Sequence, residues 1–330
     1  MANRDYQFIE STVSLCPDCL KRLDAKIVLR NGSVFLLKHC PEHGAQEELL
    51  EDDGRYYLDR FAYDKPGTIS KTQTERKDGC PFDCGLCPEH DQHTCIGLIE
   101  VTSKCDLRCP VCYAGSGAGG DCLPLAKIGK MLDFFSDSEY GKAEILQLSG
   151  GEPTTHPQIV DIIKLARTKV KYVFLNTNGL RLAEDEKLAA ELGQFTGGFE
   201  VYLQFDGFEA GTHERLRGRD LSALKQKAIA NLAKYKVPVT LVTTAAKGVN
   251  DGELGRVTEF GINAGNIRGV NFQPVALWGR LENVARKDRL TITGIIDRLE
   301  KQTKGMLKKS DFVPLPCDVD RVALTYLYRT

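Results

Sequence analysis

The second part of the chain alternates between two hydrophobic patterns. Short apolar, β-branched runs lie at 96–102, 144–148, 171–176, 199–205, 238–244 and 269–274. Between them, apolar residues recur every three to four positions, as at 125–135, 159–168 and 221–235, which is typical of amphipathic helices. This alternation predicts an α/β fold with a parallel sheet and right-handed crossovers. Six such units predict a partial (β/α)6 barrel, whose ligands bind where the strands end.

The first part of the chain follows a different pattern. Strand-like runs at 26–29 and 34–38 flank Asn31-Gly32, the residue pair most typical of a two-residue β-turn, and so predict a hairpin. A polar stretch at 64–78 contains few apolar residues and predicts a linker. We therefore expect a small module at 1–63, a linker segment at 64–95, the barrel at 96–305 and a C-terminal extension at 306–330.

Charge and hydropathy exclude several classes of protein. Lys and Arg total 44 and Asp and Glu total 45, so no overall basic field favours binding to nucleic acid. No apolar stretch approaches the roughly 18 residues of a membrane-spanning helix, and the polar N-terminus lacks the apolar segment of a secretory signal. We expect a cytoplasmic protein that has no transmembrane segment and does not bind nucleic acid.

The cysteines indicate metal chemistry. The chain has 12 of them, and all except Cys122 and Cys317 fall in groups between residues 16 and 112. Structural disulfides are rare in a reducing compartment, so metal ligation is the expected use of the grouped thiols. Cys122 is expected to be a free thiol, and Cys317 has no local partner.

Three cysteines occupy the loop after the first predicted barrel strand. Cys105, Cys109 and Cys112 have the spacing C-x3-C-x2-C. A structural site uses four protein ligands, whereas three leave a coordination position open, as a catalytic centre requires. These residues therefore predict a [4Fe–4S] cluster with one iron free to bind an external ligand. The alternative is a zinc knuckle completed by a distant residue.

Further candidate residues lie after the later strands. Gly150 and Gly151 permit a close approach of the backbone to a ligand, and Glu152 can accept a hydrogen bond from an ammonium group. The third strand ends in an Asn-Thr-Asn-Gly segment that includes Asn178. The alternative for both segments is an ordinary glycine turn. The remaining strand ends supply Gln204, Asp206, Thr243 and Gln273 as candidates.

A four-ligand metal site is predicted around the N-terminal hairpin. Its residues are Cys16, Cys19, Cys40 and His43, with the paired spacing of zinc ribbons and rubredoxin-like knuckles. Four protein ligands saturate a tetrahedral ion, which indicates a structural role. The ligand set favours zinc and leaves a mononuclear iron open. The module at 1–63 is therefore expected to bind metal through a Cys3His set.

A second C-x3-C-x2-C group lies in the linker segment. Cys80, Cys84 and Cys87 repeat the spacing of the later loop, and Cys95 or His90 could supply a fourth ligand. This group predicts an auxiliary [4Fe–4S] cluster. Another zinc site is the alternative.

The loop at 105–112, the Gly-Gly-Glu-Pro at 150–153 and the Asn-Thr-Asn-Gly at 176–179 together resemble the radical S-adenosylmethionine (radical SAM) superfamily. The resemblance implies that the open iron binds S-adenosylmethionine, whose reductive cleavage yields a 5′-deoxyadenosyl radical for C–H activation. It also implies a reductant such as ferredoxin or flavodoxin. It also implies contacts with S-adenosylmethionine. Tyr113 would lie beside the adenine, the Gly-Gly-Glu-Pro segment with Glu152 would hold the methionine amino group, and Asn178 would lie near the cofactor. The ends of the fourth and fifth strands would contact the ribose and the carboxylate.

The combined motifs narrow the resemblance. The N-terminal knuckle, the cysteines at 80–95, the loop at 105–112 and the late Pro-Leu-Pro-Cys at 314–317 resemble the group of archaeal tetraether lipid synthase and dihydropterin methyltransferase. This implies C–C bond formation or methylation on a lipid or pterin-like small molecule. No second cysteine follows Cys317, so we expect a relative with a shortened C-terminus or one completed by a partner. A radical SAM maturase of a peptide or protein and a non-catalytic zinc-binding scaffold are the alternatives.

Overall fold

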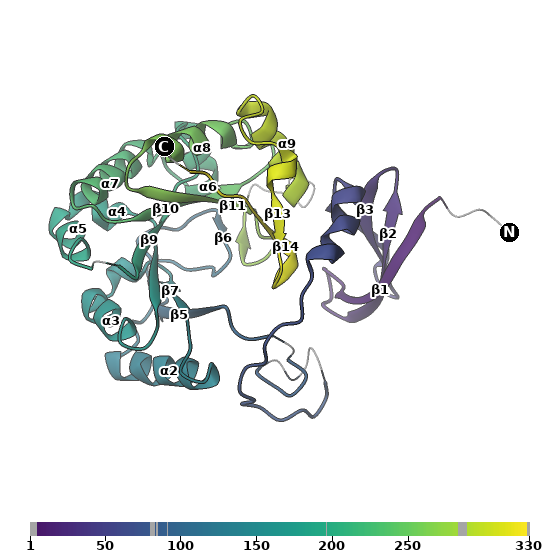
Figure 1. Cartoon of the computed structure of the whole chain (residues 1–330), viewed down its shortest axis with the longest axis horizontal. Coiled ribbons are helices and arrows are strands. Elements are labelled where there is room, and N and C mark those ends of the chain that lie inside the picture. Colours follow the sequence, from purple (N-terminus) through teal and green to yellow (C-terminus); the bar gives the residue numbers. More distant parts are fainter. Residues whose placement is uncertain are drawn as a thin grey trace. The chain divides into compact units, whose positions relative to one another are not determined.

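The computed structural model describes residues 5–79, 83, 85–90, 92–195, 197–282 and 289–328 (Figure 1). The chain forms two compact units. Unit 1 contains Met1–Lys65 together with Leu290–Thr330, and unit 2 contains Pro66–Arg289. The C-terminal residues thus pack with the N-terminal module instead of standing alone. The finer boundaries expected at 63, 95 and 305 stay predictions.

Unit 2 is built on a six-stranded parallel sheet with the order β11-β10-β9-β8-β7-β5. The strands are β5 (Ile96–Thr102), β7 (Ile145–Gly150), β8 (Tyr172–Thr177), β9 (Phe199–Gln204), β10 (Val239–Ala245) and β11 (Ile267–Pro274). They match the six predicted runs to within two residues at each end. The sheet curves around a centre (Figure 1), which confirms the predicted α/β partial barrel.

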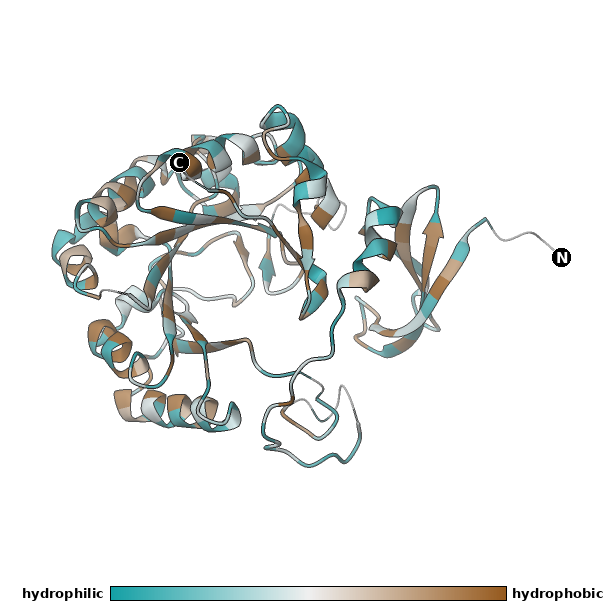
Figure 2. Cartoon of the chain, in the orientation of Figure 1, coloured by the Kyte–Doolittle hydropathy of each residue, from teal (hydrophilic) through white to brown (hydrophobic). Residues whose placement is uncertain are grey.

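The helices of unit 2 cover the outer face of this sheet. They are α2 (Leu125–Ser138), α3 (Ile159–Ala166), α4 (Leu180–Glu184), α5 (Glu186–Leu192), α6 (Ala210–Arg217), α7 (Ser222–Lys234) and α8 (Leu254–Asn263). Strand β8 shows the resulting alternation: Val173 and Leu175 are fully buried in the core, whereas Phe174 and Asn176 are half-buried on the inner face. Buried and half-buried positions therefore alternate along this strand, and apolar residues are frequent on the strands of the barrel (Figure 2).

Unit 1 contains a four-stranded antiparallel sheet with the order β1-β2-β3-β4. Its strands are β1 (Gln7–Leu15), β2 (Arg22–Arg30), β3 (Ser33–Cys40) and β4 (Gly44–Glu51). Asn31 and Gly32 join β2 to β3 with φ values of 51° and 81°, as a tight hairpin turn requires, so the predicted hairpin is confirmed. The edge strands β1 and β4 were not predicted, because their exposed faces interrupt the apolar pattern.

The rest of unit 1 joins segments from both ends of the chain. It includes α1 (Gly54–Asp59), the 3-10 turns η1 (Arg60–Tyr63) and η4 (Lys309–Asp311), α9 (Ile292–Gln302), β13 (Val313–Leu315) and β14 (Asp318–Leu324). The buried Arg60 lies over the Tyr57 ring and forms an ion pair with Asp320 at 2.6 Å. The Thr293 amide donates to the buried Glu51 carboxylate at 3.1 Å. These contacts bind the C-terminal segment to the N-terminal sheet.

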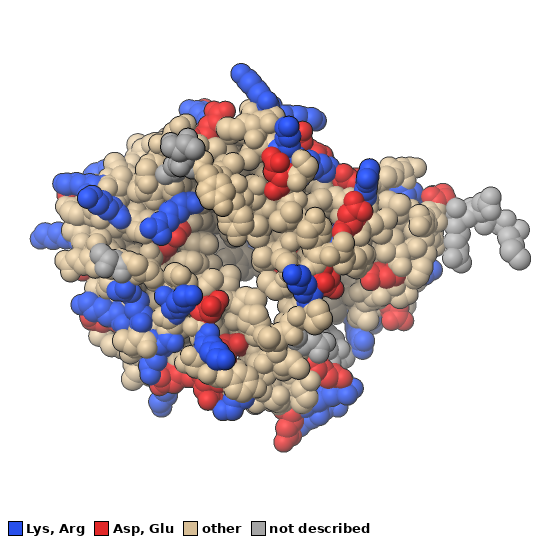
Figure 3. Space-filling view, viewed as in Figure 1, with Lys and Arg blue, Asp and Glu red and all other residues tan. Residues whose placement is uncertain are grey.

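Two surface properties agree with the sequence. Within the described part of the chain, no helix is long and apolar enough to cross a membrane. Positive and negative side chains are interspersed over the face drawn in Figure 3, as the balanced composition indicates.

The core of unit 2 generates a stability prediction. Leu148 of β7 is fully buried against the helices, whereas Leu98 of β5 is half exposed. Leu148→Ala is expected to lower the free energy of unfolding of unit 2 by about 2–5 kcal/mol, because it leaves a cavity. Leu98→Ala should cost less than about 1 kcal/mol. Denaturant unfolding followed by circular dichroism measures both, and equal losses would contradict the assigned faces.

Candidate active site and metal centre

The loop with Cys105, Cys109 and Cys112 lies over the carboxyl ends of β5 and β7. Cys105 is buried shortly after the end of β5 at Thr102, and Cys112 belongs to the short strand β6 (Val111–Cys112). Backbone hydrogen bonds from the end of β7 hold the start of the loop: the Gly151 and Glu152 amides donate to the carbonyls of residues 102 and 104 at 2.8 and 2.9 Å. The three predicted cluster ligands are thus held at the edge where the barrel strands end.

The three thiols of the loop are not grouped as closely as the ligands of a bound zinc ion. Thiolates around one tetrahedral zinc ion lie about 3.8 Å apart, given a Zn–S bond near 2.3 Å. Among the described residues, Cys105, Cys109 and Cys112 are in no group of ligand atoms that all lie within 4.8 Å of one another. Burial raises the pKa of Cys105 to about 12, so its thiol keeps its proton until a metal displaces it.

Gly150 and Gly151 are required by the close approach of the cysteine loop. A Cβ on Gly150 would lie 2.1 Å from the Thr102 carbonyl oxygen, and one on Gly151 would lie 2.3 Å from that of Lys104. Gly150 also has a φ of 129°, which side chains rarely allow. The glycine pair therefore lets β7 pass directly beneath the loop.

Glu152 is almost fully buried and accepts several hydrogen bonds. Its Oε1 accepts from the Thr154 amide at 3.0 Å, from the Thr154 hydroxyl at 2.6 Å and from the Thr177 hydroxyl at 2.7 Å. Its Oε2 accepts from the Asn178 amide at 2.7 Å. Burial raises the pKa of Glu152 above its usual range despite these donors. The carboxyl group is therefore held in one orientation at the ends of β7 and β8.

Asn178 connects the end of β8 to the cysteine loop. Its Nδ2 donates to the Asp106 carboxylate at 2.6 Å, next to Cys105 in the chain. Its carbonyl oxygen accepts from the Nζ of Lys225, which also donates to Gln204 Oε1 at 2.9 Å. Lys225 is fully buried, and burial lowers its pKa to about 8. The contacts form a continuous chain from the loop to the end of β9.

A buried ion pair follows β9. Asp206 is fully buried and accepts two hydrogen bonds from the Arg217 guanidinium at 2.7 and 2.8 Å. Arg217 also donates to the Thr244 hydroxyl at 2.9 Å, and Gln204 donates to the Asp206 carboxylate. Burial alone would raise the pKa of Asp206, but the charge of Arg217 brings it below its usual range. Gln204 and Asp206 are therefore fixed beside each other.

Three predicted residues take positions outside this network. Thr243 is fully buried, and its hydroxyl donates to the Phe205 carbonyl at 2.6 Å, on the strand face opposite to Thr244. Gln273 is exposed and pairs in register with Thr244. Tyr113 is half exposed, with its hydroxyl 3.4 Å from that of Ser149. The structure thus joins Glu152, Asn178, Gln204 and Asp206 and leaves these three apart.

Arg217 and Lys225 were missed in the sequence. Lys225 had a signal, because it shares the buried stripe of α7 with Ala228, Ile229 and Leu232, and a lysine at an apolar position needs a buried partner. Nothing in the sequence marked Arg217 as a site residue. It is the last residue of α6, next to a glycine, and only folding brings it to its partner Asp206.

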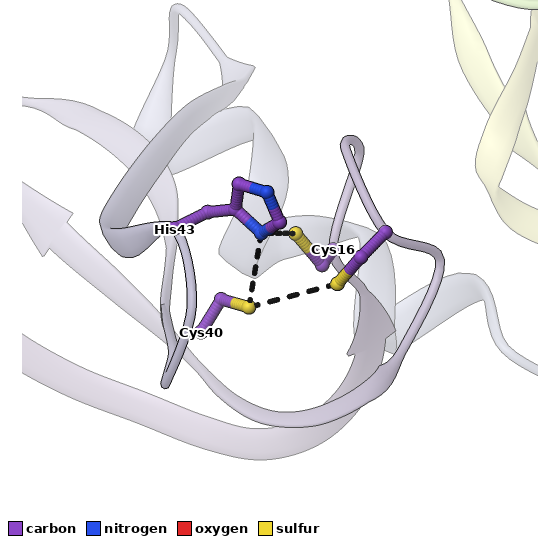
Figure 4. A group of neighbouring side chains, drawn as sticks. Cys16, Cys40 and His43 are labelled. Atoms are coloured by element: carbon purple, nitrogen blue, oxygen red, sulfur yellow. Dashed lines mark hydrogen bonds between the residues drawn. The ribbon is translucent and has the colours of Figure 1, made fainter.

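The predicted N-terminal metal ligands converge at one point (Figure 4). The ligand atoms of Cys16, Cys19, Cys40 and His43 all lie within 4.8 Å of one another. His43 Nδ1 is 3.6 Å from Cys16 Sγ and 3.5 Å from Cys40 Sγ, and the Cys19 and Cys40 sulfurs are 3.7 Å apart. These separations agree with the roughly 3.8 Å expected around a tetrahedral zinc ion.

Two of the cysteines predicted to hold an auxiliary cluster, Cys80 and Cys84, lie outside the described residues. Cys87 is buried, His90 is exposed, and Cys95 Sγ lies 3.5 Å from His93 Nε2. Ligation of a cluster by this group stays a prediction.

Comparisons with known proteins agree with this architecture. Residues 99–261 match the Radical SAM superfamily, and residues 8–52 match the HMPTM N-terminal zinc ribbon domain. The 7,8-dihydro-6-hydroxymethylpterin dimethyltransferase of Methanocaldococcus jannaschii is 38% identical over 93% of this chain and 61% of that protein. A probable GTP 3′,8-cyclase of Thermococcus kodakarensis is 30% identical over 51% of this chain and 53% of that protein.

A solved structure shows the same fold. Streptococcus suis SuiB bound to its precursor peptide SuiA aligns with a TM-score of 0.52 and 13% identity, covering 89% of this chain and 69% of that one. At this identity, the likeness concerns the fold alone. The chain spans about three fifths of the length of the M. jannaschii relative. The family match and the barrel architecture agree: residues 99–261 form a domain of the radical SAM superfamily, and residues 8–52 form a zinc ribbon.

Proposed function

We propose that the protein is a radical SAM methyltransferase that replaces a hydrogen with a methyl group on a reduced pterin or a close analogue. The observation that carries this proposal is the 38% identity to a pterin dimethyltransferase across 93% of the chain. The similarity extends over both the zinc ribbon and the barrel. A match to the barrel alone would support the superfamily without a substrate class.

The residues at the carboxyl edge suit the cofactors of this family. Cys105, Cys109 and Cys112 would hold a [4Fe–4S] cluster through three thiolates. Glu152 would accept a hydrogen bond from the ammonium group of S-adenosylmethionine, since its Oε2 accepts only from the Asn178 amide among the described residues. When bound, the cluster and S-adenosylmethionine supply a one-electron cleavage that yields a 5′-deoxyadenosyl radical. A reductant such as ferredoxin or flavodoxin would supply the electron.

The inner face of the barrel favours a polar planar substrate over a lipid chain. Asn176 Nδ2 donates to Gln147 Oε1 at 3.2 Å, while Asn176 Oδ1 is buried without a partner among the described residues. Phe174 and Tyr202 stack beside them with ring centroids 4.7 Å apart. A pterin offers ring N–H donors and a flat face, which match an unpaired acceptor and an aromatic surface. A hydrocarbon chain would leave the amide oxygen unsatisfied.

Product analysis tests the reaction. Reconstituted wild-type protein, incubated anaerobically with S-adenosylmethionine, reductant and 7,8-dihydro-6-hydroxymethylpterin, is expected to form 5′-deoxyadenosine and a methylated pterin, both detected by mass spectrometry. Cys109→Ala should abolish both products, because the cluster loses one of three ligands. Cys122→Ala is the matched control, since Cys122 is a nearby half-buried thiol outside the motif, and should retain activity. Formation of 5′-deoxyadenosine by Cys109→Ala would overturn the cluster assignment.

The zinc ribbon generates a separate prediction. Cys16→Ser is expected to reduce bound zinc and the yield of folded protein more than the specific activity of the folded fraction, because structural metal binding contributes to folding free energy. Elemental analysis and soluble yield measure the effect, with Cys122→Ser as the control. Normal yield with lost activity would indicate a catalytic metal at this site instead.

A further inference from the structure

The chain after β11 returns to the cysteine loop. The short strand β12 (Arg280–Leu281) pairs antiparallel with β6, so that Arg280 is the partner of Cys112 and Leu281 that of Val111. The Glu282 amide donates to the Pro110 carbonyl at 2.8 Å and extends the pairing. A segment far downstream, 171 residues from Cys109 in the case of Arg280, is therefore hydrogen-bonded to the backbone of the predicted cluster ligands.

Arg280 bonds to carbonyls on both sides of this pairing. Its Nε donates to the Cys109 carbonyl at 2.6 Å, and its Nη2 donates to the Ser116 carbonyl at 2.7 Å. Its Nη1 lies 3.4 Å from the Gly115 carbonyl. A planar guanidinium can hold several acceptors in a fixed geometry, which the single ammonium of lysine cannot reproduce. The side chain thus ties the cysteine turn to the glycine-rich segment that follows it.

The close approach of this segment depends on glycine. A Cβ on Gly279 would lie 2.3 Å from the Tyr113 carbonyl oxygen and 2.4 Å from that of Cys112, and the residue has a φ of 73°. Any other residue here would push the segment away from the loop. Gly279 and Arg280 therefore act together: the glycine permits the close approach, and the arginine hydrogen-bonds to the backbone between Cys109 and Ser116.

We propose that Arg280 is a positioning residue for the iron–sulfur cluster, which it serves by fixing the backbone of the ligand loop and placing a positive charge beside the backbone of Cys109 and Cys112. This inference rests on the cluster ligation proposed above. It does not depend on the identity of the substrate.

The charge of Arg280 has an electrostatic consequence. Neutral carbonyl oxygens accept all three hydrogen bonds, so these contacts leave the positive charge uncompensated, unlike the contact of Arg217 with Asp206. A cluster with three thiolate ligands is anionic and gains further negative charge on reduction. A nearby fixed cation stabilises the reduced form more than the oxidised form. Arg280 should therefore raise the reduction potential of the cluster.

Two variants separate the charge from the hydrogen bonds. Arg280→Lys keeps the positive charge but loses the planar guanidinium that reaches several carbonyls. Arg280→Gln keeps amide donors but loses the charge. Arg167→Gln is the matched control, because Arg167 donates to the Gly197 carbonyl at 2.9 Å near the amino ends of β8 and β9, away from the cysteine loop. Each reconstituted full-length variant is compared with wild type by redox titration with electron paramagnetic resonance and by the rate of iron loss to a chelator.

Arg280→Gln is expected to shift the midpoint potential to a more negative value, so that the ratio of reduced to oxidised cluster at a fixed potential falls by at least about threefold. Arg280→Lys should keep the potential near that of wild type. Both variants should release iron about tenfold faster, with zinc content unchanged. Arg167→Gln should match wild type in every measurement.

Other outcomes are equally informative. Potentials and iron-release rates in both Arg280 variants that equal those of wild type would overturn the inference. Equal changes in Arg167→Gln would also overturn it, because the effect would then be general instability. If wild-type protein assembles no [4Fe–4S] cluster, the proposed function itself fails, and that result is distinguishable because it appears before any variant is compared.

Discussion

Burial of charged groups at the carboxyl edge of the sheet is the constraint on which the site depends. Asp206, Glu152 and Lys225 are almost completely excluded from solvent, and an unpaired buried charge costs several kcal/mol. Each is therefore stabilised by partners from other strands or helices. This requirement fixes the ends of β7, β8 and β9 relative to α6 and α7 without any bound ligand.

The cysteine loop is added to that fixed edge by close backbone contacts. Gly150 and Gly151 bring β7 against its underside, and Gly279 brings the segment after β11 against the backbone of Cys112 and Tyr113. Each contact requires the absence of a Cβ, so the loop geometry depends on glycines from distant parts of the chain. The cysteine loop is thereby held by the rigid sheet instead of by its own residues alone, as precise positioning of ligands requires.

The zinc ribbon and the barrel differ in how locally they are encoded. In the ribbon, two knuckles and a tight turn lie within 28 residues, from Cys16 to His43, and the four ligands converge as their spacing predicted. In the barrel, Asn178 and Asp106 meet across 72 residues, and Arg280 meets Ser116 across 164. Only the parallel order of the strands brings these partners together.

The sequence by itself determined the six barrel strands, the N-terminal hairpin, the Cys3His set and the family, because each depends on local hydrophobic periodicity or on fixed residue spacing. The choice between Thr243 and Thr244 required the structure, since adjacent residues of a strand face opposite sides and the sequence does not say which side is open. The roles of Arg217, Lys225 and Arg280 also required it. Their partners are defined by long-range packing, which no local pattern records.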